Sequence, residues 1–118
     1  MRHAKKGKKF HRTSGRRRSF LRNLASDLIR AERIETTESR AKAIRPIVEC
    51  LVTHAKKQTL ASRRLLLARL HNATVVHKLY EEIAPRYKDR NGGYLRIIKT
   101  MKAQKRSGAS LAVIEFVR

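Results

Sequence analysis

Apolar side chains recur at helical spacing near the start of the chain, from Ser14 or Gly15 to Ala31. One side of a helix over these residues collects apolar side chains, namely Phe20, Leu21, Leu24, Ala25, Leu28 and Ile29. The opposite side collects polar and basic side chains, namely Arg16, Arg22, Asn23, Ser26 and Arg30. The pattern predicts an amphipathic helix with one packed face and one face open to solvent or a ligand.

A second helix is predicted directly after Thr37. Thr37 is a suitable N-cap, and Glu38 places a carboxylate near the positive end of the helix dipole. The apolar positions that follow are spaced three and four residues apart, as a helix requires: Ala41, Ile44, Val48, Leu51 and Ala55. Pro46 falls inside this stripe, and we expect it to kink the helix or split it in two, because proline removes a backbone donor.

Two shorter helices are predicted further along. Residues 60–70 form the third, and residues 72–84 form the fourth, with Pro85 as its stop signal. The inward side of the fourth helix is expected to carry Val75, Val76, Leu79 and Ile83. Residues 86–93 then have the composition of a basic loop that ends in the flexible pair Gly92 and Gly93.

Three segments read as strands because they are rich in β-branched or aromatic residues. Residues 33–37 form a brief one, and residues 94–101 and 111–117 form a pair joined by the polar, basic loop 102–110. An antiparallel C-terminal hairpin is the natural interpretation, with the Ile34 segment able to add a third strand. The chain is therefore predicted to be α+β, with about four helices packed on a small, mostly antiparallel sheet.

The composition indicates a negatively charged partner. The chain has 118 residues, 30 Lys and Arg against 9 Asp and Glu, and a formal net charge of +21. Such self-repulsion weakens a compact state unless a polyanion neutralises it. The hydrophobic content of 41% nevertheless supports one folded domain.

Membrane insertion and secretion are not expected. The longest apolar runs, residues 65–68 and 111–114, are too short to span a bilayer, and the N-terminus lacks the apolar core of a secretory signal. A single cysteine, Cys50, excludes an intramolecular disulfide and agrees with a reducing compartment. We therefore expect a cytoplasmic protein.

The positive charge is concentrated at the N-terminus. Residues 1–22 hold ten Lys and Arg and no acid, and the first carboxylate is that of Asp27. Residues 1–13 have too little apolar surface to offset their ordering entropy. We expect them to be a basic arm that orders on binding its partner, followed by a single α+β domain over residues 14–118.

Catalysis and metal binding find little support in the sequence. The carboxylates are scattered, and the adjacent pair Glu81 and Glu82 is best interpreted as a solvated acidic spot. Cys50 and His54 are spaced as two zinc ligands on one helix would be, but no second pair completes a site, and Cys50 is expected to be a small buried thiol. We expect no enzyme, no cofactor, no metal and no small-molecule substrate.

The basic residues carry the functional prediction. Arginine and lysine neutralise phosphates and release counterions, and the 18 Arg outnumber the 12 Lys, which favours bidentate contacts with phosphate. The run Arg16, Arg17 and Arg18 beside an acid-free arm is the strongest candidate. Charge on an arm, a helix face, a loop and a hairpin tip together indicates folded RNA rather than a DNA groove. With only 5% aromatic residues, base stacking by single-strand binders is disfavoured.

Two alternatives from other classes stay open at this point. One is a DNA-compacting protein of the histone-like kind, which requires a β-arm dimer and comparable affinity for any duplex. The other is a membrane-active cationic protein, which requires a strongly amphipathic helix exposed in the free state.

Several short motifs occur in order along the whole chain. They are Met1-Arg2-His3, Arg22-Asn23, Thr36-Thr37 followed by Ala41-Lys42, Arg63-Arg64, Ala84-Pro85-Arg86-Tyr87, Gly92-Gly93-Tyr94 with Arg96, and Ile114-Glu115-Phe116-Val117. Together they resemble the family of bacterial large-subunit ribosomal protein seventeen. The resemblance runs from Met1 to Val117 and departs from the family pattern at Gly15-Arg16-Arg17, so the local contacts are expected to differ there.

The resemblance implies a structural protein of the large ribosomal subunit, bacterial or organellar, that binds large-subunit rRNA on the solvent side towards the polypeptide exit region. Its partners are expected to be rRNA and neighbouring ribosomal proteins, with no membrane and no homo-oligomer. From the basic residues and the resemblance together, the candidate rRNA contacts are Arg2, His3, Lys5, Lys6, Lys8, Lys9, His11, Arg12, Arg16, Arg17, Arg18, Arg22, Asn23, Arg63, Arg64, Arg86, Arg90 and Arg96. Gly92 and Gly93 would let the loop backbone turn close to RNA or reverse into the following strand.

Overall fold

The structure is a computed structural model that describes residues 8–118. Four helices are α1 (Ser14–Ala31), α2 (Glu38–Lys56), α3 (Leu60–Leu70) and α4 (Ala73–Lys78). Helix α4 continues as a π-helical turn, η1 (Leu79–Ile83), and a 3-10 turn, η2 (Ala84–Tyr87). The strands are β1 (Arg33–Thr37), β2 (Leu95–Ala103) and β3 (Ser110–Phe116). The α+β class predicted from the sequence is confirmed.

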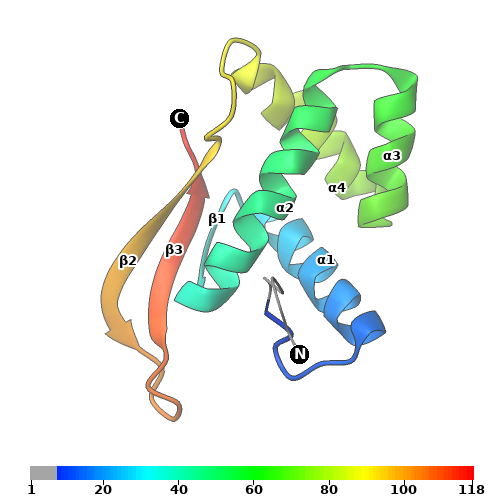
Figure 1. Cartoon of the computed structure of the whole chain (residues 1–118). Coiled ribbons are helices and arrows are strands. Elements are labelled where there is room, and N and C mark those ends of the chain that lie inside the picture. The colour runs from blue at the N-terminus through cyan, green and yellow to red at the C-terminus, as the bar shows by residue number, and fades with distance from the viewer. Residues whose placement is uncertain (1–7) are drawn as a thin grey trace, which may run out of the picture.

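All strand pairs are antiparallel, and the strand order in the sheet is β1-β3-β2. The predicted C-terminal hairpin is therefore present, and the Ile34 segment pairs with β3 from the other side. Figure 1 shows the three strands on one side of the molecule, with α2 running between the sheet and the remaining helices. Helix α2 contacts all three strands as well as α1 and α3, so it is the centre of the core.

The side chains of the core follow the predicted stripes. On α2, Ala41, Ile44 and Val48 are fully buried, and Leu51 is only 2% exposed. The end of the sheet is closed by three aromatic rings: Tyr87 lies 5.1 Å from Tyr94 and 6.4 Å from Phe116, measured between ring centroids. Thus aliphatic side chains fill most of the core and aromatic ones seal one edge.

Helix caps place the ends of the helices. The Thr37 hydroxyl accepts a hydrogen bond from the Arg40 amide, as its predicted role as N-cap requires. Thr59 and Ser62 form a reciprocal capping box on α3. Asn72, expected inside the fourth helix, instead precedes α4 and caps it by accepting from the amides of Thr74 and Val75.

Two prolines that were predicted to interrupt helices are accommodated in different ways. Helix α2 runs through Pro46 without being split, and Figure 1 draws it as one ribbon. Pro46 lies on the exposed side of α2, as does Lys42, so the residue 42 carbonyl that loses its donor can bond to water. The helical run of α4 and η1 ends at Ile83, one residue before the predicted end, and Pro85 lies at the start of η2, where a missing amide hydrogen costs nothing.

Two side chains lie on the opposite side from their prediction. Cys50 is exposed rather than buried, because it is rotated about 100° from Leu51 and falls outside the packed stripe. Ser26 is buried rather than on the polar face, being only 6% exposed. Helix α1 contacts α2 together with α3 and α4, so its buried arc is wider than the apolar stripe alone indicates.

Candidate nucleic-acid interface

The first part of the interface is the start of α1 with the chain that leads into it. Arg16 and Arg18 are exposed, whereas Arg17 is half-buried and donates to the Arg12 carbonyl at 3.5 Å. Thr13 is the N-cap residue of α1. The predicted arm and the predicted basic helix face therefore meet at one point of the surface.

Phe20 fixes the base of the arm on α1. Its ring meets the Phe10 ring edge to face, with 5.5 Å between centroids. The Arg12 guanidinium lies 4.0 Å above the Phe20 ring, and the Arg40 guanidinium lies 5.1 Å from it. Residues 10–12 are thus held against the domain. Lys8, Lys9 and His11 are exposed beside this contact, and the predicted contacts of Arg2, His3, Lys5 and Lys6 lie outside the described residues.

Three of the predicted arginines are held by carboxylates from distant parts of the chain. Arg63 lies 3.3 Å from Glu81, Arg96 lies 2.7 Å from Glu115, and Arg86 donates to Glu32. Arg33 also contacts Glu115, at 3.6 Å, across the outer face of the sheet. These guanidiniums are partly neutralised within the domain. Each ion pair connects two separate segments of the fold, whether or not the arginine also binds a ligand.

The Glu32 carboxylate lies between two cations, Arg86 and Lys78. Glu32 lies just after α1, in the left-handed backbone conformation that ends the helix, and accepts from Arg86 while Lys78 lies 3.8 Å away. The hydrogen bond from Arg86 lowers the pKa of the Glu32 carboxyl below its usual value. The carboxylate therefore remains charged and ties the end of α1 to η2.

Other predicted arginines have no such partner. Within residues 8–118, no carboxylate lies within 4 Å of Arg16, Arg18 or Arg64, all of which are exposed. Arg22 is half-buried and lines a hollow of about 260 Å³ together with Asn23, His71 and Asn72. The first half of α1 therefore presents arginines that are available to an external anion.

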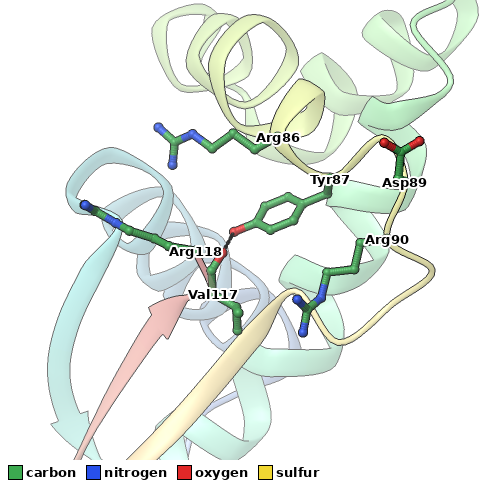
Figure 2. Close-up of a pocket in the computed structure, with 6 residues that line it drawn as sticks. All are labelled: Arg86, Tyr87, Asp89, Arg90, Val117 and Arg118. Atoms are coloured by element: carbon green, nitrogen blue, oxygen red, sulfur yellow. Dashed lines mark hydrogen bonds between the residues drawn. The ribbon is translucent and has the colours of Figure 1, made fainter.

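A larger hollow, of about 750 Å³, opens where the end of β3 meets the loop after η2. Figure 2 shows Arg86 and Arg118 extending to the same side of it, with Arg90 on the other side of the Tyr87 ring. The carboxylate of Asp89 points away from these guanidiniums. Because Arg86 is already bonded to Glu32, Arg90 and Arg118 are the cations of this hollow that suit an external anion.

The floor of the hollow is rigid. The Tyr87 hydroxyl donates to the Val117 carbonyl at 2.6 Å (Figure 2). The Val117 amide donates to the Tyr94 carbonyl at 2.8 Å. Burial raises the pKa of the Tyr87 phenol, so it stays protonated and keeps donating. The end of β3 is thereby fixed to the loop that carries Arg90.

The loop over residues 88–93 is shaped by its glycines and anchored by a lysine. Gly92 and Gly93 have φ angles of +89° and +63°, which favour glycine, so both residues turn the backbone as expected. The Lys56 ammonium donates to the Arg90 carbonyl and, at 3.0 Å, to the Tyr94 hydroxyl. Arg90 in turn donates to the Gly93 carbonyl at 3.2 Å.

Several exposed cations are not among the predicted contact residues, although the positive charge of the hairpin tip was noted from the sequence. Arg118 lines the large hollow, and Lys102, Lys105 and Arg106 lie at the exposed end of the β2-β3 hairpin. A signal for the hairpin cations was present, because residues 90–114 contain no Asp or Glu, just as residues 1–26 contain none. No sequence pattern indicated a role for Arg118, because only the fold brings it close to Arg86.

Comparison with known proteins identifies the family. A family model described as ribosomal protein L17 matches residues 20–117 of the chain. The chain belongs to the ribosomal protein L17 family. A relative named large ribosomal subunit protein bL17, from Persephonella marina, is 54% identical over 118 residues, which cover 99% of this chain and 95% of the relative.

Two further relatives of the same name are similar at nearly full length. The protein from Thermodesulfovibrio yellowstonii is 50% identical over 117 residues, covering 99% of this chain and 87% of the relative. The protein from Fusobacterium nucleatum is 49% identical over 117 residues, covering 99% of this chain and all 100% of the relative. The resemblance derived from short motifs is confirmed, and the chain is a ribosomal protein of the L17 family.

Two further observations concern other kinds of site. Among residues 8–118, no cluster of three or more His, Cys, Asp or Glu side chains is placed to hold a metal ion. The helices in this same part of the chain are also too short or too polar to cross a membrane.

Proposed function

We propose that this L17 family member binds large-subunit rRNA as a structural constituent of the large ribosomal subunit, working in the cytoplasmic ribosome or in that of an organelle. Its basic arm, the start of α1 and the loop after η2 hold phosphates and stabilise the shape of the folded RNA. The family resemblance supports a place on the solvent side near the polypeptide exit region, with neighbouring ribosomal proteins as further partners.

One observation carries the proposal. The start of α1 presents Arg16 and Arg18 without a carboxylate within 4 Å in residues 8–118, at the point where the basic arm joins the domain. Two residues apart on a helix, these guanidiniums point in different directions, and each is left without a neutralising partner in the described chain. A nucleic-acid backbone supplies anions at regular spacing.

The arginines held by carboxylates have a second task in this proposal. Arg63, Arg86 and Arg96 join separate elements of the fold and so keep the phosphate-binding side chains in place. Arg90 and Arg118, on the large hollow, supply the direct contacts at that end of the molecule.

The proposal is tested by reconstitution and by salt dependence. We expect the purified chain to co-sediment with the large subunit at physiological salt, and recovery in ribosome-free fractions alone would contradict the proposal. Removing residues 1–13 should lower the affinity for large-subunit rRNA and reduce its dependence on salt, by roughly 0.7 to 0.9 in log-log slope for each lost phosphate contact. An unchanged slope would show that the arm makes no phosphate contact.

The position in the subunit needs a separate measurement. Crosslinking the chain within purified subunits, followed by mapping of the RNA and protein sites, should place it near the exit region. Equal affinity of the free chain for any duplex DNA, together with dimer formation, would instead favour the DNA-compacting alternative.

A further inference from the structure

The hairpin tip, residues 100–109, lies away from the core. Figure 1 shows the turn between β2 and β3 projecting beyond the helices, at the end of the molecule where α1 begins. Residues 101–108 are all exposed. Since the tip buries none of these side chains, it contributes little to the stability of the domain.

The tip is nevertheless ordered by its own hydrogen bonds. The Gln104 amide donates to the Ala109 carbonyl at 3.0 Å, and the Gly108 amide donates to the Gln104 carbonyl at 2.9 Å. The Ser107 hydroxyl donates to the Gln104 side chain at 2.7 Å, and Gly108 has a φ angle of +69°. A closed turn of this kind presents its side chains in a fixed arrangement without help from the rest of the chain.

Three cations occupy this turn without acidic partners. Within residues 8–118, no carboxylate lies within 4 Å of Lys102, Lys105 or Arg106. Lys99, one step before the tip, differs because it lies 3.5 Å from Glu38. The change from compensated to uncompensated charge therefore coincides with the point at which the hairpin leaves the domain.

A bulge places one apolar side chain among these cations. The β2-β3 register passes from Lys99 opposite Ala112 to Ala103 opposite Ser110, so β2 holds two residues more than β3 over this stretch. Met101 lies in the bulge and is fully exposed. Bulges re-aim side chains, and a flexible thioether pointing away from the core can pack against an external flat surface.

We propose that the hairpin tip is a second RNA-binding element, in which Lys102, Lys105 and Arg106 hold phosphates and Met101 packs against an exposed base or ribose. This inference rests on the proposed function, because it assigns a further contact with the same rRNA. A protein partner is less suitable, since one apolar side chain surrounded by uncompensated cations offers little surface to bury. Phosphate neutralises the cations, and the sugar and base faces between phosphates accept the methionine.

Two triple variants with equal net charge test the phosphate contacts. The first replaces Lys102, Lys105 and Arg106 by glutamine. The control replaces Arg30, Lys42 and Arg45 by glutamine, because these cations are already paired with Asp27, Glu38 and Glu49. Circular dichroism should show that the tip variant keeps the fold.

The measurement is binding to transcribed large-subunit rRNA over a series of salt concentrations. We expect the tip variant to lower the log-log salt slope by about 2 to 3, and the control variant to leave it close to that of the unmodified chain. Equal reductions in both variants would overturn the inference, because net charge rather than the tip would then be responsible. An unmodified chain that fails to bind would instead contradict the proposed function.

Met101→Ser tests the remaining contact. We expect a loss of affinity of about threefold to tenfold with an unchanged salt slope, because the lost contact is apolar. Unchanged affinity would overturn the assignment of Met101. If the tip triple variant binds rRNA normally but fails to enter the subunit, the tip contacts a protein and the inference is wrong.

Discussion

The start of α1 and the end of the sheet are both rich in arginine, yet their arginines differ in what they hold. Near the start of α1, Arg16 and Arg18 are exposed and have no carboxylate within 4 Å in the described chain, 8–118. At the end of the sheet, Arg86 and Arg96 are held by Glu32 and Glu115. A high density of positive charge therefore does not by itself locate a binding surface. The positions of the few carboxylates distinguish arginines that are paired within the domain from arginines that are available to a ligand.

The largest expected effect is the loss of the folded domain that carries both regions. Leu51→Asp should unfold the domain, at a cost of more than about 4 kcal/mol, because a carboxylate would be buried in the α2 stripe without a partner. Thermal denaturation followed by circular dichroism measures this. Ile47→Asp, at a position 37% exposed on the same helix, is the control and should cost far less. A native spectrum for Leu51→Asp would show that the α2 facing is wrong.

The comparison itself is tested by opposite responses of the two regions. Replacing Arg16 and Arg18 together by glutamine should reduce the salt slope of rRNA binding by roughly 1 to 2 and leave stability within about 0.5 kcal/mol of the unmodified chain. Arg86→Gln should lower stability by up to about 1 kcal/mol and leave the slope unchanged. Filter binding and urea denaturation give the two quantities. A slope that falls equally in both variants would remove the distinction.

The pH dependence of stability tests the ion pair between Glu32 and Arg86. Because Arg86 holds the pKa of this carboxyl below its unfolded value, its contribution to stability is present above the unfolded pKa and is lost as pH falls through the folded pKa. The difference in free energy of unfolding between the unmodified chain and Glu32→Gln should therefore shrink on acidification. Urea denaturation at neutral and acid pH measures it. Glu82→Gln is the matched control, since no cation lies within 4 Å of Glu82 in residues 8–118, and a constant difference for Glu32→Gln would contradict the assignment.

A further prediction concerns Phe10, at the base of the predicted arm. Phe10→Ala should cost about 0.5 to 1.5 kcal/mol, because it removes the edge-to-face contact with Phe20. It should also weaken rRNA binding slightly without changing the salt slope, since no cation is lost. Thermal melting and filter binding measure both effects. Phe10→Leu is the matched variant that keeps an apolar contact, and equal losses for both variants would indicate that ring geometry rather than burial fixes the arm.

Local patterns predicted most of the fold. The helical stripe of α2, the N-cap Thr37 and the β-rich segments around Ile97 and Ile114 are each readable within a short window of sequence. The effect of a proline is harder to predict, because it depends on whether the affected backbone faces water, as at Pro46, or begins a turn, as at Pro85.

The candidate site was harder to predict for a related reason. The carboxylate that holds Arg86 lies 54 residues away, and the one that holds Arg96 lies 19 residues away. No local window brings these partners together, so the sequence could name the arginines without separating paired from unpaired ones. The assignment of the candidates to rRNA stays a prediction until the binding measurements above are made.

The strand order has a consequence for how the protein is made. Because β3 lies between β1 and β2, neither outer strand has a neighbour until β3 has been synthesised, although β1 is made early. A growing chain can close its helices by contacts that are near in sequence, but the sheet waits for the last strand to be made. A chain interrupted before β3 therefore lacks the sheet, and with it the hairpin that projects from the sheet.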